Sequence, residues 1–253
     1  MHVRSSLRCA FLSMLLLGSG CGAEPDQDPG LPPNLLTDPK TCRQGPLPRL
    51  FVRGNWLSAM CSGVEVPVRL KGINRSGLQH KSSLSYAGFP TDPRTELQRF
   101  RTDWHAVAVR LPIAQDFYLG NPAYREDIRK IVSATQSEGQ YLILEIHGYS
   151  FNLNPPLPDA QTATLWEQLA RSYGSETHVV FDLWNEPRAA SWNVWKAQAE
   201  SLLQVIRDAG ATDTVVLVGG LDYAYDLSAL AESQNRIHDL GPVVYATHPY
   251  PFK

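Results

Sequence analysis

The chain has 253 residues, of which 43% are hydrophobic and 19% are charged, so it can bury a sizeable core and is not a disordered polypeptide. Its length allows one large domain or two small ones. The formal net charge of −2 provides no basic face, and we therefore expect no nucleic-acid partner. The six Trp and ten Tyr fit an ordinary core as well as a surface that stacks sugar rings, so their number alone decides nothing.

Residues 1–20 predict an export signal. The basic segment MHVRSSLR precedes the apolar run CAFLSMLLLGSG, which is too short to span a bilayer. The run ends in LLLGSGC, which is similar to a bacterial lipobox, so we expect Cys21 to carry lipid. Gly18 stands where such boxes prefer Leu, and ordinary cleavage with release is the alternative. The expected location is the bacterial cell envelope, through a lipid anchor, or the cell exterior.

Two cysteines, Cys42 and Cys61, remain in the expected mature protein. An exported protein lies where disulfides persist, so we expect these two to pair. The sequence has no CxxC spacing or Cys/His cluster, and we predict no metal and no cofactor. Residues 21–49 are rich in Pro, Asp and Gly without periodicity, which predicts an extended, poorly packed tether before a domain over 50–253.

Beyond residue 49, apolar strands alternate with helices. Strands are predicted around 66–73 and at 106–113, 141–149, 178–184, 214–220 and 241–250. Helices are predicted at 92–104, 121–139, 159–174, 191–210 and 226–234. Asp92 and Asn121 are expected N-caps, each followed by a proline at the first helical position, and Gly139 is expected to end the second helix.

Apolar strands separated by helices indicate a parallel sheet covered on both sides. An open doubly wound sheet is the first alternative, but it usually has a Gly-rich phosphate turn after its first strand, and GINRSGLQH lacks the GxGxxG spacing. A (β/α)8 TIM barrel, in the α/β class, fits better, because polar residues gather at one end of nearly every strand.

Polar side chains follow six consecutive strands, at the end where a barrel builds its active site. In strand order they are Asn74 and Arg75, Arg110, His147, Asn185 and Glu186, Asp222 and Tyr223, and His248 and Tyr250. Each alone has an ordinary structural explanation, such as an ion pair or a hydrogen bond in the core. All six together indicate one shared site.

The segments GINRSG, VRLP, LEIHGY, FDLWNEP and THPYP, in this order, resemble glycoside hydrolase family 5. This family contains the cellulase-like retaining glycosidases on a (β/α)8 barrel, and the resemblance covers residue 50 to the C-terminus. It implies that Glu186 is the general acid/base and that Asn185 hydrogen-bonds the sugar 2-hydroxyl. It also implies that Arg110 and Tyr250 hold the nucleophilic carboxylate.

The same resemblance implies that His147 and His248 line the site. Asn74 is a further supporting residue. Tyr223 and Trp192 are candidate stacking faces, whereas Trp195 is expected to pack on the barrel.

A retaining glycosidase needs one carboxylic acid to protonate the leaving oxygen and a second carboxylate about 5 Å away to attack the anomeric carbon. The acid must keep its proton near neutral pH, so its pKa must be raised by low dielectric or by a nearby negative charge. Glu186 lies between an apolar strand and Pro187, which suits the first of these causes.

The nucleophile of the family is a glutamate after the seventh strand, and a tryptophan commonly follows on the eighth. We expect about six of the eight units in this chain and the nucleophile beyond Lys253. Glu145 is expected to lie deeper than His147, with a buried partner. Asp222 and Asp226 can at best bind sugar.

The first hypothesis for function is therefore an exported, endo-acting β-glycosidase, with cellulose-like β-1,4-glucan as the first candidate substrate. Mannan, xyloglucan and β-1,3-glucan stay open, because specificity in barrels lies in loops. The alternatives are a non-catalytic polysaccharide-binding barrel at the cell surface and an inactive gene fragment. The expected partners are polysaccharide and, through the lipid anchor, a membrane, and the protein is expected to be a monomer.

Overall fold

The computed structural model describes residues 32, 34–42 and 45–251, nearly all of which belong to the second of two compact units, Pro33–Lys253. The predicted signal and Cys21 lie outside the described residues. Within the described ranges, no helix has the length and apolar character needed to cross a membrane.

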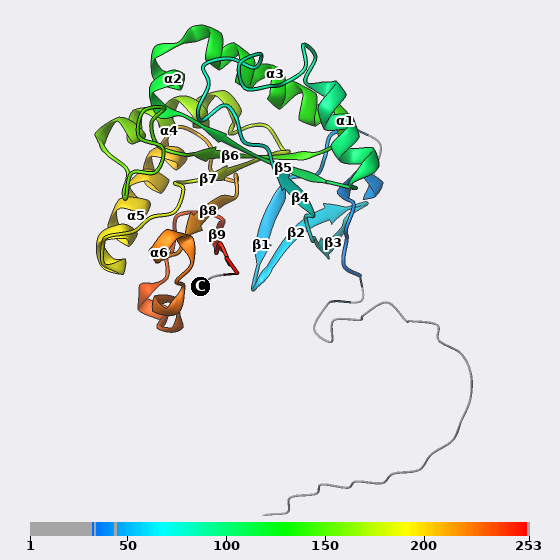
Figure 1. Cartoon of the computed structure of the whole chain (residues 1–253). Coiled ribbons are helices and arrows are strands. Elements are labelled where there is room, and N and C mark those ends of the chain that lie inside the picture. Colours follow the sequence, from blue (N-terminus) through cyan, green and yellow to red (C-terminus); the bar gives the residue numbers. More distant parts are fainter. Residues whose placement is uncertain (1–31, 33, 43–44, 252–253) are drawn as a thin grey trace, which may run out of the picture. The chain divides into compact units, whose positions relative to one another are not determined.

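Six parallel strands form the central sheet, and their order in the sheet is their order along the chain (Figure 1). They are β4 (Gly72–Asn74), β5 (Ala108–Ile113), β6 (Tyr141–Ile146), β7 (Val179–Asp182), β8 (Val216–Gly219) and β9 (Val243–Ala246). A doubly wound sheet reverses its strand order at a switch point, whereas a barrel does not. The predicted α/β barrel class is confirmed, with six of the eight strands in the described residues.

The helices that follow the strands are α1 (Arg94–Asp103), α2 (Gln115–Gly120), α3 (Pro122–Glu138), α4 (Ala160–Tyr173), α5 (Trp192–Asp208) and α6 (Leu221–Ala224). The predicted signals of α3 are confirmed: Asn121 caps its start, and Gly139 ends it in the left-handed conformation. Helix α1 begins at Arg94, one residue later than predicted. The helix predicted at 226–234 is wrong, because two short 3-10 helices, Ser228–Ala231 and Ser233–Asn235, occupy this range.

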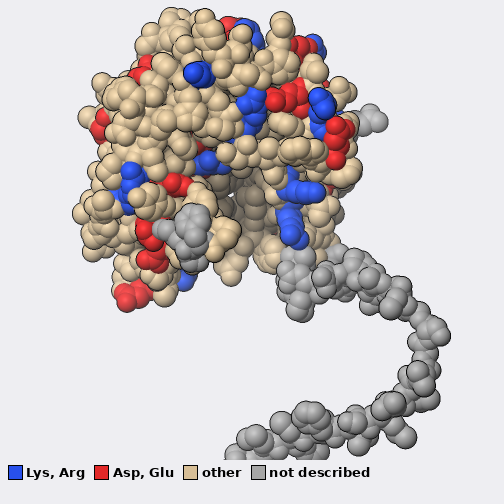
Figure 2. Space-filling model, in the orientation of Figure 1, with Lys and Arg blue, Asp and Glu red and all other residues tan. Residues whose placement is uncertain are grey.

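The core has two parts because side chains on a strand alternate between faces. The outward side chains of the strands, such as Leu144 and Phe181, pack against helix residues such as Ile128, Trp166 and Leu203. The inward side chains near the strand starts form a smaller apolar cluster inside the barrel. Basic and acidic side chains are both scattered over the face drawn in Figure 2.

An antiparallel sheet that the sequence did not predict closes the N-terminal end of the barrel. It consists of β1 (Leu50–Arg53), β2 (Trp56–Cys61) and β3 (Val64–Pro67). Leu50 and Ala59 of this sheet cluster with Ala108, Tyr141 and Val180 at the starts of the parallel strands. The single strand predicted around 66–73 is therefore wrong, because the run is divided between β3 and β4.

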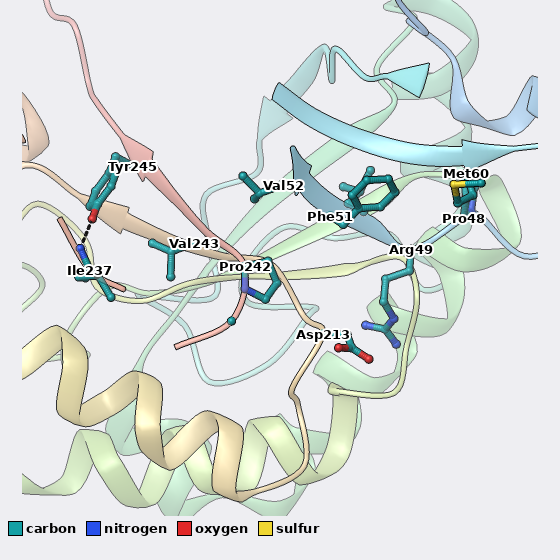
Figure 3. A pocket seen from close by; sticks show the side chains of 12 residues that line it. Pro48, Arg49, Phe51, Val52, Met60, Asp213, Ile237, Pro242, Val243 and Tyr245 are labelled. Atoms are coloured by element: carbon teal, nitrogen blue, oxygen red, sulfur yellow. Dashed lines mark hydrogen bonds between the residues drawn. The ribbon is translucent and has the colours of Figure 1, made fainter. Parts of the chain in front are cut away.

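Strands β4 and β9 are the two edges of the parallel sheet in the described part of the chain. A cavity of about 710 Å³ lies between β1 and β9 (Figure 3). Its wall is largely apolar and includes Phe51, Val52 and Val243. None of the predicted active-site residues lines it, so this cavity is separate from the mouth of the barrel.

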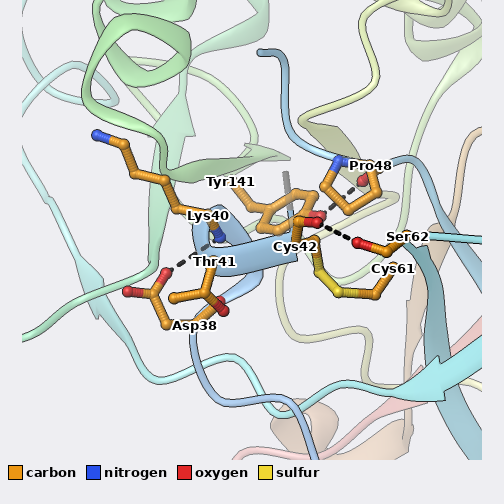
Figure 4. Close-up of a disulfide and its surroundings, with 8 residues drawn as sticks. All are labelled: Asp38, Lys40, Thr41, Cys42, Pro48, Cys61, Ser62 and Tyr141. Atoms are coloured by element: carbon orange, nitrogen blue, oxygen red, sulfur yellow. Dashed lines mark hydrogen bonds between the residues drawn. A yellow bond between two sulfur atoms is a disulfide. The ribbon is translucent and has the colours of Figure 1, made fainter. Parts of the chain in front are cut away.

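The prediction of a poorly packed tether over 21–49 is wrong for the described residues from Leu36 onward. Leu36 bridges Val68 in parallel register, and Leu47 is buried. Cys42 forms a disulfide with Cys61 of β2 (Figure 4), the pairing that the sequence predicted. Scattered apolar residues and one disulfide thus attach a Pro-rich segment that has no periodic pattern of its own.

Candidate active site

Arg110 is the centre of the predicted site. It lies on β5 and points into the barrel, where its guanidinium donates to Asn74 Oδ1 and to Asn185 Oδ1, each at 3.1 Å. Asn74 is the last residue of β4, and Asn185 lies three residues after the end of β7. From its position within β5, the arginine therefore links the end of β4 to the segment after β7. Because the Asn185 oxygen accepts from Arg110, the amide nitrogen of that side chain donates elsewhere, here to Asn154 Oδ1 at 3.5 Å.

Two buried acids lie beneath the mouth, on the inward faces of neighbouring strands. Glu145 of β6 and Asp182 of β7 are register partners. Arg110 contacts both, with Nε 2.9 Å from Asp182 Oδ2 and an Nη 3.5 Å from Glu145 Oε2. The Glu145 side chain is fully buried and also lies 3.1 Å from His147 Nδ1, in agreement with the predicted buried partner.

The pKa values follow from this burial. Burial alone would lower the pKa of Arg110, but the carboxylates of Glu145 and Asp182 outweigh it and raise that pKa. Burial raises the pKa of the Asp182 carboxyl, and the attraction of Arg110 only partly opposes this. Asp182 was not among the predicted site residues, although an acid at an inward position of an apolar strand is the signal that marks it.

Glu186 lies just beyond β7 and is held by three side chains. Tyr250 donates its hydroxyl to Oε1, His248 Nδ1 lies 3.1 Å from the same oxygen, and Asn154 Nδ2 donates to Oε2 at 3.1 Å. The side chain keeps 13% of its surface exposed. Its φ of 49° is uncommon for a residue with a side chain, and such backbone strain is frequent at functional sites.

The expectation that burial raises the pKa of Glu186 is wrong for this arrangement. Burial does push the pKa of the carboxyl upward, but the hydrogen bonds from Tyr250 and His248 lower it more, so it lies below its ordinary value. The same contact with Glu186 raises the pKa of Tyr250 to about 12. These hydrogen bonds thus favour the carboxylate form of Glu186.

Asn154, which the sequence analysis did not identify, belongs to the loop between β6 and α4. This loop is fastened to the end of β7, because Trp184 Nε1 donates to the Pro155 carbonyl at 3.3 Å and Arg188 donates to the Asn154 carbonyl. The loop therefore places Asn154 beside Glu186. Its sequence, FNLNPPLPD, carries no periodic signal that would have singled it out.

Comparison with known proteins agrees with this geometry. The family profile named Cellulase (glycosyl hydrolase family 5) matches residues 63–252, which include every residue predicted for the active site, from Asn74 to Tyr250. The chain belongs to glycosyl hydrolase family 5. The family resemblance found in the sequence is thereby confirmed.

Several family 5 relatives are endoglucanases. Endoglucanase MaCel5A of Microbulbifer sp. is 30% identical over 177 residues, which are 68% of this chain and 32% of the relative. Endoglucanase 5 of Pectobacterium carotovorum is 29% identical over 187 residues, which are 72% of this chain and 35% of the relative. The chain thus spans about a third of the length of these curated relatives.

Solved structures of the family share the fold. The catalytic domain of Thermobifida fusca endoglucanase Cel5A superposes with a TM-score of 0.63 at 26% identity, covering 79% of this chain and 64% of that domain. The β-glucanase SdGluc5_26A of Saccharophagus degradans, in complex with cellotetraose, superposes with a TM-score of 0.65 at 23% identity. This match covers 89% of the present chain and 68% of the SdGluc5_26A chain. The similarity to SdGluc5_26A concerns the fold alone.

Within this family 5 barrel, two of the predicted residues differ from their expected role. Tyr250, implied to hold the nucleophile, hydrogen-bonds Glu186 itself. Arg75 turns away from the mouth: its Nε lies 3.0 Å from Glu96, and its guanidinium lies over the Phe89 ring at 3.9 Å. Arg75 therefore attaches α1 to the preceding loop.

The residues predicted as aromatic stacking faces differ in their exposure. Trp192 and Trp195 are buried, and each donates its indole N–H to a backbone carbonyl at 2.8 Å, so Trp192 is not a stacking face. Tyr223 follows β8 in a left-handed turn with φ of 64° and is 40% exposed. The Arg188 guanidinium lies 4.8 Å from the centre of its ring, so one face of Tyr223 is already occupied.

The same turn carries two acids, Asp222 and Asp226. Asp222 also has a left-handed φ, of 52°. Asp226 accepts a hydrogen bond from the Ser228 backbone N–H at 2.8 Å. Among the described residues, no group of three or more His, Cys, Asp or Glu side chains is placed to hold a metal ion.

Replacing Tyr250 with Phe is expected to raise the pKa of the Glu186 carboxyl, because the variant loses a hydrogen bond that favours the ionised form. The titration can be followed by NMR on the side-chain carboxyl carbon of Glu186. Tyr86→Phe is the control, since Tyr86 is 75% exposed in the β4–α1 loop, and it should leave the titration unchanged. An unchanged or lowered pKa in Tyr250→Phe would contradict the contact.

Proposed function

We propose that this protein is an O-glycosyl hydrolase that cleaves β-linked glucan, with Glu186 as its general acid/base. The observation that carries the proposal is the placement of Glu186, which lies beyond a barrel strand, is partly exposed, and is held by side chains from the β9 end and the β6–α4 loop. The membership of this chain in family 5 and the endoglucanase names of its relatives support the same conclusion.

In the proposed reaction Glu186 gives its proton to the glycosidic oxygen as the bond to the anomeric carbon breaks, and it later takes a proton from water. Asn185 donates its amide N–H to the sugar 2-hydroxyl, since Arg110 already occupies the amide oxygen. Arg110, held by Asp182 below, keeps Asn185 in this orientation.

We propose that the nucleophile is a glutamate from the part of the barrel that this chain does not span. The chain covers 64% of the Thermobifida fusca catalytic domain. Glu145 and Asp182 are unsuited to attack, because both are buried and paired with Arg110. A second carboxylate beside Glu186 would raise the pKa of Glu186 and restore the proton that the acid step needs.

Binding of cellotetraose to the full chain, measured by calorimetry, tests the substrate class. We expect cellotetraose to bind more tightly than mannotetraose or a β-1,3-linked glucose tetramer. The Thermobifida fusca domain, which has been solved with cellotetraose, is the basis for this choice. Absence of binding to every β-glucan oligosaccharide would overturn the proposal, and binding without cleavage even when azide supplies the nucleophile would favour the non-catalytic polysaccharide-binding barrel.

We also propose that the protein is exported, with Cys21 as the lipid-bearing residue or with release after signal cleavage. The pattern of residues 1–21 supports this, and a disulfide between Cys42 and Cys61 fits an oxidising compartment.

A further inference from the structure

A short hairpin in the β6–α4 loop presents two aromatic rings. Phe151, at its tip, is 79% exposed. Its ring lies 5.0 Å from the ring of Tyr149, with 30° between the planes. A single exposed aromatic residue needs no explanation, but here the partly buried Tyr149 ring supports the exposed Phe151 ring on a fixed turn, which gives an ordered apolar surface.

The hairpin is held by hydrogen bonds to its flanks. Tyr149 and Asn152 exchange backbone hydrogen bonds, at 3.0 and 3.1 Å. The Ser150 N–H donates to Asp116 at 2.8 Å, and the Ser150 hydroxyl donates to the other oxygen of the same carboxylate at 2.5 Å. The Tyr149 hydroxyl donates to Asp159 and accepts from Gln115 at 2.8 Å. Helix α2 and the start of α4 thus both hold the hairpin with its two rings in place.

The same loop also carries Asn154, which contacts Glu186. Gly148 has φ of +97°, and a Cβ there would lie 2.3 Å from Pro155 Cδ, so the loop is tightly closed at its base. Asn154, which contacts Glu186 at 3.1 Å, is three residues after Phe151. Three residues span about 11 Å at most, which is within the reach of a tetrasaccharide bound at Glu186.

We infer that the ring pair of Tyr149 and Phe151 is a subsite that stacks a sugar ring of the glucan chain; this inference rests on the proposed function. The C–H face of a β-linked glucose ring is flat and apolar, and it matches an exposed aromatic surface. The hydrogen bonds of the hairpin keep this surface ordered in the absence of substrate, so little conformational entropy is lost on binding.

Calorimetric titration of the full chain with cellotetraose tests the subsite. Phe151→Ala is expected to weaken binding about 10-fold, which corresponds to roughly 1.4 kcal/mol, whereas Phe151→Tyr should bind nearly as the original protein does. Trp104→Ala is the matched control, because Trp104 is a 60% exposed aromatic residue outside this loop, directly after α1, and it should leave the affinity unchanged.

The outcomes separate this inference from the proposed function. If the original protein binds cellotetraose and Phe151→Ala binds equally well, the subsite is wrong and the proposed function stands. If the original protein binds no β-glucan oligosaccharide, both are wrong. The exposure of Phe151 makes a folding defect in the Ala variant unexpected, and an unchanged near-UV circular dichroism spectrum verifies this.

Discussion

Glu186→Gln is expected to slow the cleavage of cello-oligosaccharides by about 10²–10⁴-fold, because the amide cannot give a proton to the leaving sugar. A substrate with an activated leaving group, 2,4-dinitrophenyl β-cellobioside, should be affected far less, since dinitrophenolate leaves without a proton. Azide added to both assays supplies an external nucleophile, so that the comparison concerns the acid alone. Azide attacks the anomeric carbon while the glycosidic bond breaks, and the product is a glycosyl azide.

Glu126→Gln is the matched control for this experiment, because Glu126 is an exposed acid on α3, paired only with Arg129 among the contacts of its side chain that the structure describes. It should change neither rate. Equal losses on both substrates in Glu186→Gln would contradict the role of acid and would indicate a general defect in binding. No loss on either substrate would show that another group gives the proton.

The positions of the mouth residues could be predicted because a parallel barrel collects the ends of its strands. Asn185 and Glu186 follow an apolar run and Arg110 lies within one, and such runs identify strands without any knowledge of the neighbours. The inward-facing charged residues could also have been predicted from the sequence. Arg110, Glu145 and Asp182 each place a charge at an inward position of a strand. Because side chains on a strand point alternately to its two faces, the sequence was enough to place Asp182 on the same inward face as Arg110 and Glu145.

What the sequence could not provide depends on contacts between distant segments. Asn154 reaches Glu186 only because its loop folds back over the end of β7. The loop sequence has no hydrophobic periodicity from which this contact could be predicted. The division of residues 66–73 between two sheets depends on packing below the barrel and not on propensity, since strand-forming residues occur in both halves, with Val66 and Val68 in one and Leu70 and Ile73 in the other. The direction of the pKa shift of Glu186 likewise depends on Tyr250, a residue far along the chain whose hydrogen bond opposes the burial.

Arg110→Met is expected to lower the free energy of unfolding by about 3–5 kcal/mol at pH 7, because it leaves two carboxyl groups buried without their cation. Chemical denaturation with urea measures the difference. Arg129→Met is the matched control: its guanidinium pairs with Glu126 on the surface of α3 and is 63% exposed, so its loss should cost less than about 1 kcal/mol.

The pH dependence of this loss separates the buried ion cluster from simple packing. A carboxyl group whose pKa is raised in the folded state stabilises the fold fully below its ordinary pKa, and this contribution is lost as pH rises through the raised value. Burial already raises the pKa of Asp182 above its ordinary value of 3.8, and removal of Arg110 should raise it further. The loss of stability in Arg110→Met should therefore shrink as the pH falls from 7 toward 4, as Asp182 takes up a proton. A loss that is equal at both pH values would mean that Arg110 stabilises the barrel through the packing of its side chain and not through its charge.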